Sequence, residues 1–127
     1  MNFTYAGLPI RIVFGRGKIS EAGAEAKRLG MRCPLVITTA HQSEQGSSVA
    51  QAVGGAHWAG AAMHTPIPET ERALAFFIGR EADGVISLGG GSSTGLGKAL
   101  AFRTDCPQLV IPTSYAGSEM KIGRAHV

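Results

Sequence analysis

Short apolar runs of strand length alternate with segments of helical period along this 127-residue chain. The strand-like runs are residues 11–14, 34–38, 58–63, 85–88 and 109–111, and the helix-like segments are residues 19–29, 42–53, 69–78 and 96–102. This alternation is typical of βαβ units, in which each helix connects two parallel strands. The sequence therefore predicts an α/β fold with a parallel sheet and flanking helices.

Several residues predict where these helices begin and end. Ser20 is the expected N-cap of the first helix and Gly30 its stop. The second helix is the weakest prediction, because its serines and Gly46 lower its helix propensity. Pro66 and Pro68 block continuation of the preceding segment, so we expect the third helix to run from residue 69 onward.

Length and charge limit the classes of protein that this chain can belong to. A chain of 127 residues suits one domain of roughly 100–150 residues. The formal net charge of +3 includes Lys121 and Arg124, and without them ten basic side chains face nine acidic ones. We therefore expect no nucleic-acid partner, because the chain has no basic run that would contact phosphates.

Cysteine and hydropathy patterns indicate a cellular compartment. Cys33 and Cys106 lie far apart in the sequence and belong to no CxxC motif, so we expect two buried free thiols. The first ten residues lack the pattern of a signal peptide, and no uncharged stretch is apolar enough to span a bilayer. We expect a cytoplasmic protein without a membrane partner.

The strongest chemical signal is the run Gly89-Gly90-Gly91 between a buried strand and a helix. Glycines let backbone N–H groups approach a phosphate closely, and the start of the following helix directs its free N–H groups at the anion. The hydroxyls of Ser92, Ser93 and Thr94 add donors. The sequence therefore predicts a phosphate site at the carboxyl ends of the strands.

Two common phosphate motifs do not match this turn. A G-x-G-x-x-G motif counted from Gly89 requires glycine where Thr94 stands, and a Walker A motif requires glycine at Ser92 and a hydroxyl residue at Ala99. A glycine-rich turn that binds nothing therefore stays open as an alternative when spacing alone is considered.

The combination of two motifs resembles a known family. Residues 89–92 are followed by Pro-Thr-Ser-Tyr-Ala-Gly-Ser-Glu at 112–119, and this pair resembles the signature of the iron-containing alcohol dehydrogenase superfamily. Gly95 stands where the usual loop has Asp. The sequence at residues 89–99, 104–108 and 115–119 instead resembles that of the maleylacetate reductases within the superfamily. The resemblance covers residues 1–120.

The resemblance implies a nicotinamide coenzyme, NADH or NADPH, and a set of residues that bind it. In chain order these are Thr39, Gly89, Gly90, Gly91, Ser92, Thr113 and Ser114. The glycine turn with Ser92 would hold the diphosphate, and Thr113 with Ser114 would lie near the nicotinamide ribose. Thr39 stands where many relatives place an Asp that binds the adenosine ribose, so the choice between the two coenzymes stays open.

These residues also have purely structural interpretations. Thr113 and Ser114 could cap the next helix, and Thr39 could be an ordinary turn residue. His41, His57 and His64 form no recognisable ligand motif, so we expect no metal site. In the metal-dependent relatives the ligands belong to a second, helical domain. The sequence names no catalytic residue.

The resemblance also implies a domain organisation. Residues 1–120 are expected to form a Rossmann-like dinucleotide-binding domain, the truncated amino-terminal part of a two-domain dehydrogenase. Residues 121–127 are similar to one reading frame of a common sequencing adapter, and we expect them to be a non-native tail. The helical carboxyl-terminal domain is then absent from the chain.

The implied function of the full-length parent is reduction of the carbon–carbon double bond of maleylacetate to give 3-oxoadipate, in the degradation of aromatic compounds. Its partner is a small-molecule substrate, and a homodimer of the parent stays open. The fragment alone is expected to be inactive. Two alternatives are a non-catalytic nucleotide-binding or inert fragment, and a metal-dependent alcohol or polyol dehydrogenase relative.

Overall fold

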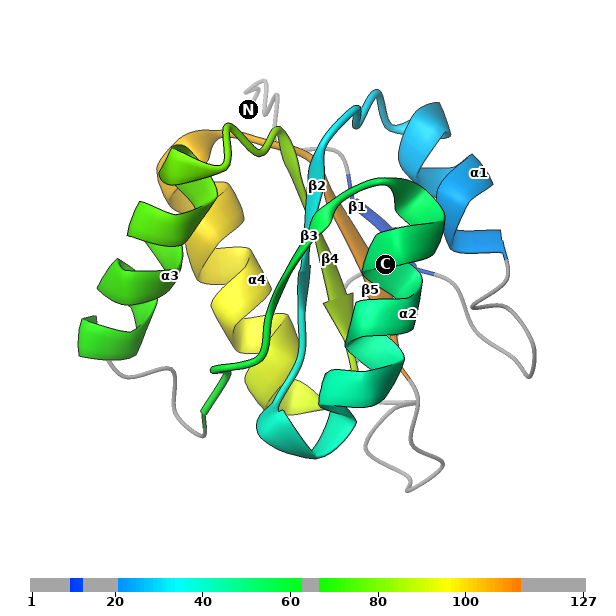
Figure 1. Cartoon of the computed structure of the whole chain (residues 1–127). Coiled ribbons are helices and arrows are strands. Elements are labelled where there is room, and N and C mark those ends of the chain that lie inside the picture. Colours follow the sequence, from blue (N-terminus) through cyan, green and yellow to red (C-terminus); the bar gives the residue numbers. More distant parts are fainter. Residues whose placement is uncertain (1–9, 13–20, 63–66, 113–127) are drawn as a thin grey trace, which may run out of the picture.

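The computed structural model describes residues 10–12, 21–62 and 67–112. Strands and helices alternate along them (Figure 1). The elements are β1 (Ile10–Ile12), α1 (Ala22–Arg28), β2 (Pro34–Ile37), the 3-10 helix η2 (Ala40–Gln42), α2 (Ser43–Val53), β3 (Ala56–Trp58), α3 (Ile67–Gly79), β4 (Gly84–Leu88), α4 (Gly91–Thr104) and β5 (Gln108–Ile111). The predicted βα alternation is therefore confirmed.

The five strands form one parallel sheet in the order β1-β5-β4-β2-β3. β4 lies at the centre, and its Ser87 is opposite Ile37 of β2 and Val110 of β5. β2 and β3 are joined by α2 and pair directly, whereas the chain passes over β2 through α3 to reach β4. The predicted parallel sheet is confirmed.

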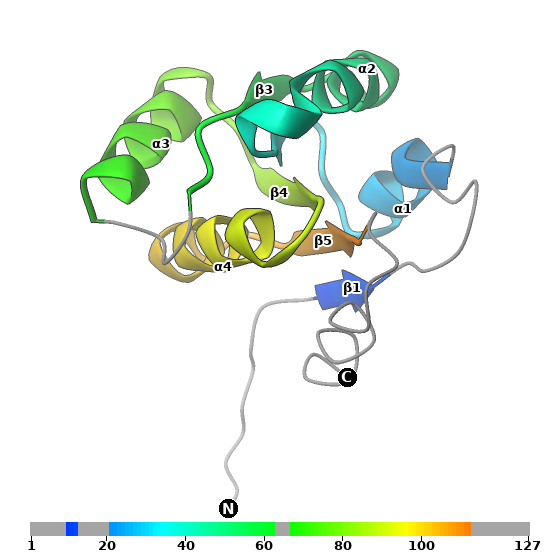
Figure 2. The same ribbon diagram turned by 90° about the horizontal axis from the view of Figure 1, so that it is seen from below.

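Helices cover both faces of the sheet, as Figure 2 shows: α1 and α2 lie on one side, α3 and α4 on the other. Successive strand side chains point to opposite faces, so Val36 and Ile86 pack with α1 and α2, while Leu35, Ile37 and Val85 pack with α3 and α4. β2, β4 and β5 are buried along their whole length. This burial on both faces explains why their sequences read as continuous apolar runs.

The first two helices end at glycines in the left-handed region. Gly30 has φ 84° and follows α1, where the N–H of Met31 donates to Ala26 O at 2.9 Å. Gly54 has φ 71° and is the C-cap of α2. Gly30 was predicted as the stop, which is confirmed. The N-cap of α1 is Glu21, and the predicted cap, Ser20, lies outside the described residues.

Two element boundaries were predicted wrongly. β3 was expected at residues 58–63 but spans Ala56–Trp58. It begins two residues earlier because α2 stops at Val53 and the chain turns through Gly54 straight into the strand. α3 was expected from residue 69 but begins at Ile67. Pro68 is accommodated in its first turn, where a backbone N–H has no intrahelical acceptor.

The last helix was also predicted too short. It was expected around residues 96–102, but it begins at Gly91 and includes the whole serine- and glycine-rich segment. Thr94 N–H donates to Gly90 O at 3.1 Å, which closes the first turn. Ser93 and Thr94 are buried there, so packing against the sheet outweighs the low helix propensity of this segment.

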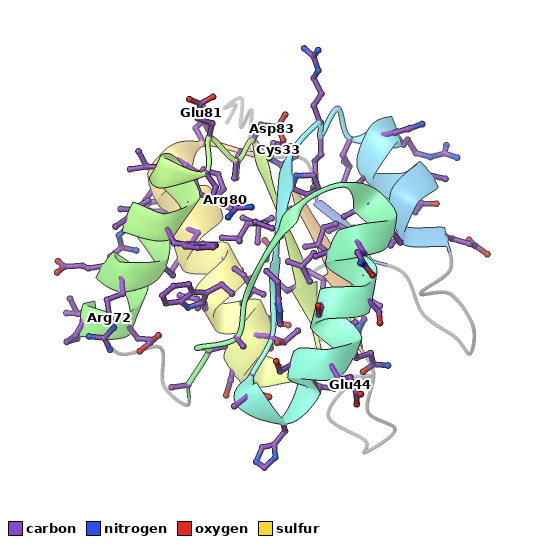
Figure 3. The ribbon with its side chains drawn as sticks, viewed as in Figure 1. Cys33, Glu44, Arg72, Arg80, Glu81 and Asp83 are labelled. Atoms are coloured by element: carbon purple, nitrogen blue, oxygen red, sulfur yellow. The ribbon has the colours of Figure 1, made fainter. Side chains whose placement is uncertain are left out.

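Asp83 links the amino ends of β2 and β4. Its carboxylate accepts hydrogen bonds of 2.8 Å from the backbone N–H groups of Arg32 and Cys33, and its own N–H donates to Cys33 O at 3.0 Å. Figure 3 shows Asp83 and Cys33 side by side, at the end of the sheet opposite Glu44 and the start of α2. Both cysteines are free; Cys106 is buried as predicted, whereas Cys33 is only half-buried at this edge.

Candidate functional site

The carboxyl ends of β2 and β4 meet at the point where the chain changes sides of the sheet. The two strands are neighbours in register, with Ile37 opposite Ser87. The chain leaving β2 enters α2 on one face, and the chain leaving β4 enters α4 on the other face (Figure 2). Such a switch point is where open α/β sheets bind ligands. Thr39 and Gly89 each lie two residues beyond this pair.

Gly89 makes the turn from β4 possible. Its φ of 124° lies in a region that residues with a side chain rarely adopt. Its N–H donates to Ile111 O at 3.1 Å, which fixes the turn to the end of β5. A Cβ at this position would collide with Gln42 Oε1 and lie 3.3 Å from Ser93 Oγ. The turn therefore requires glycine for both its backbone conformation and its surroundings.

The amino end of α4 follows this turn directly and is open for an anion. Gly90 is the N-cap residue, and within the described residues no side chain caps this helix end. A Cβ added at Gly90 or Gly91 would meet no atom of residues 10–12, 21–62 or 67–112 within 4 Å. The first turn carries no acidic side chain. Its backbone N–H groups and the positive end of the helix dipole therefore favour a phosphate group here.

A buried hydroxyl beside the turn supports a binding function. Ser93 is fully buried, and among the described residues its Oγ has no hydrogen-bond partner. Buried polar groups are rarely left unpaired, and the exceptions are often at functional sites. Ser92, the predicted diphosphate ligand, is half-buried in the same turn. The hydroxyl of Thr94 was the third expected donor, but Thr94 is buried and does not face the solvent.

Gly97 holds α4 close to the sheet. A Cβ there would collide with Ser87 Oγ and come within 2.9 Å of Gln108 Nε2 and 3.2 Å of Val85 Cγ1. Gln108 Nε2 donates to Ser87 Oγ at 3.4 Å, so a buried polar pair lies directly under the helix. The absence of a side chain at Gly97 therefore sets where the amino end of α4 stands relative to β4.

The structure brings together most of the predicted site residues that it describes. Thr39 is half-buried at the end of β2, where it is the N-cap residue of η2, and it lies across the switch point from the glycine turn. Thr113 and Ser114 lie outside the described residues. Gln42 was not predicted as a site residue, because only the folded sheet brings η2 to Gly89.

Titratable groups elsewhere have shifted pKa values that follow from burial. Desolvation lowers the pKa of His57, whose Nε2 is hydrogen-bonded to Thr38 Oγ1 at 2.8 Å. Desolvation also raises the pKa of the Cys106 thiol, and the negative charges of Asp83 and Asp105 add to this, while a hydrogen bond from Thr104 opposes it. Over the described ranges, no group of three His, Cys, Asp or Glu side chains is arranged to hold a metal ion.

Within residues 21–62 and 67–112, no helix is both long and apolar enough to cross a bilayer.

Relatives among characterised proteins match nearly the whole chain. Maleylacetate reductase of Rhizobium sp. strain MTP-10005 is 49% identical over 121 residues, which are 93% of this chain and 34% of that protein. Maleylacetate reductase 1 of Cupriavidus pinatubonensis is 43% identical over 122 residues, 94% of this chain and 34% of that protein. The chain thus spans about a third of the length of the curated relatives it matches.

Solved structures match the fold as well. The crystal structure of the Rhizobium maleylacetate reductase superposes with a TM-score of 0.80, covering 93% of this chain and 35% of that one. Maleylacetate reductase from Agrobacterium tumefaciens, 45% identical, gives a TM-score of 0.79 over 94% of this chain and 35% of that one. The family model for iron-containing alcohol dehydrogenase matches residues 9–123. The chain therefore belongs to the iron-containing alcohol dehydrogenase family.

Proposed function

We propose that this chain is the dinucleotide-binding part of an NAD(P)H-dependent reductase of the maleylacetate reductase type. The observation that carries the proposal is the glycine turn at the switch point, where an open helix end, a positive-φ glycine and a buried hydroxyl that has no partner among the described residues coincide. Identities of 43% and 49% with maleylacetate reductases across nearly all of the chain support the substrate class.

The described residues fit the diphosphate of a dinucleotide. Backbone N–H groups of Gly90, Gly91 and Ser92 would hold its oxygens, and in the part of the chain that the structure describes no side chain obstructs the two glycines. Thr39 would face the adenosine ribose with a neutral hydroxyl in place of a carboxylate, so a 2′-phosphate is not repelled there and both NADH and NADPH are proposed coenzymes. Thr113 and Ser114 would contact the nicotinamide ribose.

When bound, the coenzyme supplies a hydride to the carbon–carbon double bond of maleylacetate, and a proton completes 3-oxoadipate. The chain's own part is to fix the diphosphate, with residues 1–120 as the dinucleotide-binding domain and residues 121–127 as a non-native tail. We propose that the proton donor, the substrate-binding groups and any metal ligands belong to the rest of the full-length parent, a cytoplasmic enzyme of aromatic-compound degradation. Its partner is the small-molecule substrate, with no nucleic acid or membrane, and a homodimer is one proposed assembly.

The decisive experiment has two parts. Purified chain is titrated with NADH and with NADPH while coenzyme fluorescence is followed, for the wild type and for Gly90→Asp. We expect saturable binding in the wild type and a loss of about tenfold or more in affinity in the variant, because the new carboxylate would face the diphosphate. No binding by the wild type would contradict the proposal.

The second part tests the reaction. The full-length parent is assayed for coenzyme oxidation with maleylacetate, and with simple alcohols in the reverse direction. Turnover of maleylacetate supports the proposal. Turnover of an alcohol alone would indicate a metal-dependent alcohol or polyol dehydrogenase, and binding without turnover would indicate a non-catalytic nucleotide-binding module.

A further inference from the structure

Thr38 lies between the end of β2 and Thr39, and its backbone is held by hydrogen bonds in both directions. Its N–H donates to Trp58 O at 3.0 Å, and its carbonyl oxygen accepts from Ala61 N–H at 3.2 Å. These bonds tie the carboxyl end of β2 to β3 and to the segment after β3. Thr38 is fully buried, so the position of the chain just before Thr39 is set by its neighbours in the fold.

A further hydrogen bond reaches Thr38 from the side chain of His57 on β3. His57 Nε2 and Thr38 Oγ1 are 2.8 Å apart. In the pairing of β2 with β3, His57 is opposite Val36, so its ring reaches two residues along β2 toward the carboxyl end. β3 therefore holds Thr38 through a backbone carbonyl and through the neighbouring imidazole.

Helix α2 packs directly onto this pair at Gly46. A Cβ there would collide with His57 Nε2 and would lie 2.6 Å from Thr38 Cγ2. Glycine inside a helix costs about 1 kcal/mol relative to alanine, and the closeness of α2 to the pair gives the reason for it here. Thr39 is the N-cap of η2, which leads into α2. The chain before Thr39 and the helix after it are therefore packed against the same imidazole ring.

A polar pair at this place does something that an apolar pair would not. A hydrogen bond fixes both the distance and the direction between two groups, whereas two apolar side chains can slide past each other. Binding sites gain affinity when their contact residues are held in place before the ligand arrives. The bond between His57 and Thr38 lies one residue away from Thr39, the residue proposed to face the adenosine ribose.

We propose that His57 is a positioning residue of the coenzyme site, whose imidazole holds Thr38 at the end of β2 so that the hydroxyl of Thr39 meets the adenosine ribose. This inference rests on the proposed dinucleotide function. His57 acts through Thr38 and does not touch the coenzyme. Its loss should therefore weaken the ribose contact and leave the diphosphate contacts unchanged.

Two nucleotides distinguish these contacts, ADP and 2′-deoxy-ADP. Both carry the diphosphate, and they differ only in the ribose hydroxyl at C2′. The ratio of their dissociation constants therefore reports the ribose contact, while a general loss of stability or a change at the diphosphate cancels. For one hydrogen bond we expect the wild type to prefer ADP by about fivefold in calorimetric titrations. Thr39→Val should reduce this preference to about one.

Paired substitutions test the hydrogen bond from both of its ends. His57→Leu removes it and should lower the preference for ADP to less than about twofold. His57→Gln places an amide as many bonds from Cβ as Nε2 is, and this amide can donate or accept, so the preference should be kept. Thr38→Val should act like His57→Leu, whereas Thr38→Ser retains the hydroxyl and should act like the wild type.

Several results would overturn the proposal, and they identify which part fails. A preference lost in Thr39→Val but kept in His57→Leu and Thr38→Val would overturn the positioning role alone, as would equal losses in His57→Leu and His57→Gln. Equal binding of both nucleotides by the wild type would overturn the ribose contact of Thr39 and this role with it. Binding of neither would overturn the dinucleotide site. Thermal unfolding checks each variant; should His57→Leu fail to fold, Thr38→Val decides.

Discussion

Replacing Gly97 by alanine tests how closely α4 must lie against the sheet. The new methyl group would collide with Ser87 Oγ and would stand 2.9 Å from Gln108 Nε2 and 3.2 Å from Val85 Cγ1. These three strand residues are at most 1% exposed, so none of them can move into solvent. Either α4 moves away from β4, or Ser87 rotates and loses its 3.4 Å hydrogen bond with Gln108.

Two costs and one gain set the expected change in the free energy of unfolding. Overpacking a buried site costs about 1–3 kcal/mol, and leaving a buried polar group unpaired costs about 1–3 kcal/mol. Alanine is the better helix former by about 1 kcal/mol, which opposes both costs. Where only one of the two costs is incurred, the middle of its range less the gain predicts a fall of about 1 kcal/mol in the free energy of unfolding, and both costs together raise this to about 3 kcal/mol.

Urea unfolding followed by far-UV circular dichroism measures this change. Gly79→Ala is the matched control, because Gly79 ends α3 in an exposed position where an added Cβ meets no atom within 4 Å. That variant should be as stable as the wild type or slightly more so. Introducing Ser87→Ala first should reduce the cost of Gly97→Ala. A Gly97→Ala midpoint at or above that of the wild type, with an unchanged slope, would refute the close packing of α4.

Asp83→Ala should lower the free energy of unfolding by about 1–3 kcal/mol, because the N–H groups before β2, including that of Cys33, lose their acceptor. Asp83→Asn keeps one acceptor oxygen and should lose less stability in the same urea titration. Equal stability of the wild type and both variants would contradict a stabilising role of these hydrogen bonds. Gly89→Ala should cost about 1–3 kcal/mol through its positive φ alone, so calorimetric melting should find it destabilised even when Gln42→Ala removes the collision, and full recovery in that double variant would contradict the backbone argument. Burial lowers the pKa of His57, so the contribution of its neutral ring to stability is fully present above about pH 6.5 and is lost as the pH falls through the folded pKa. Between pH 7 and pH 5 the free energy of unfolding should therefore fall less steeply in His57→Gln than in the wild type. Identical slopes would exclude this contribution.

The sheet could be predicted because its strands are buried on both faces. β2 and β4 read as unbroken apolar runs, and their helices begin after polar or glycine residues. The ends of elements were harder, since they depend on tertiary contacts. α4 starts five residues earlier than its apolar pattern suggests, because Ser93 and Thr94 are buried by packing that no local propensity records.

The candidate site also has features that the sequence predicts and features that depend on tertiary contacts. That a glycine turn leads from β4 into a helix could be predicted, because glycines at such a place let backbone N–H groups approach an anion, but the residue at which the helix begins could not. The contact between Gln42 and Gly89 joins residues 47 positions apart, and it exists only because β2 and β4 are neighbours. The requirement for glycine at position 97 could not be predicted either, since it comes from the side chains of Ser87 and Gln108 beneath the helix.

The hydrogen bond from Gly89 N–H to Ile111 O makes the bend after β4 depend on the end of β5. The loop that would cradle the diphosphate and the carboxyl end of β5 thus share this hydrogen bond. A shift of Ile111 would move the acceptor and so displace the loop, and an anion held by the loop would in turn restrain Ile111. Coenzyme affinity and the position of the end of β5 should therefore be reciprocally linked.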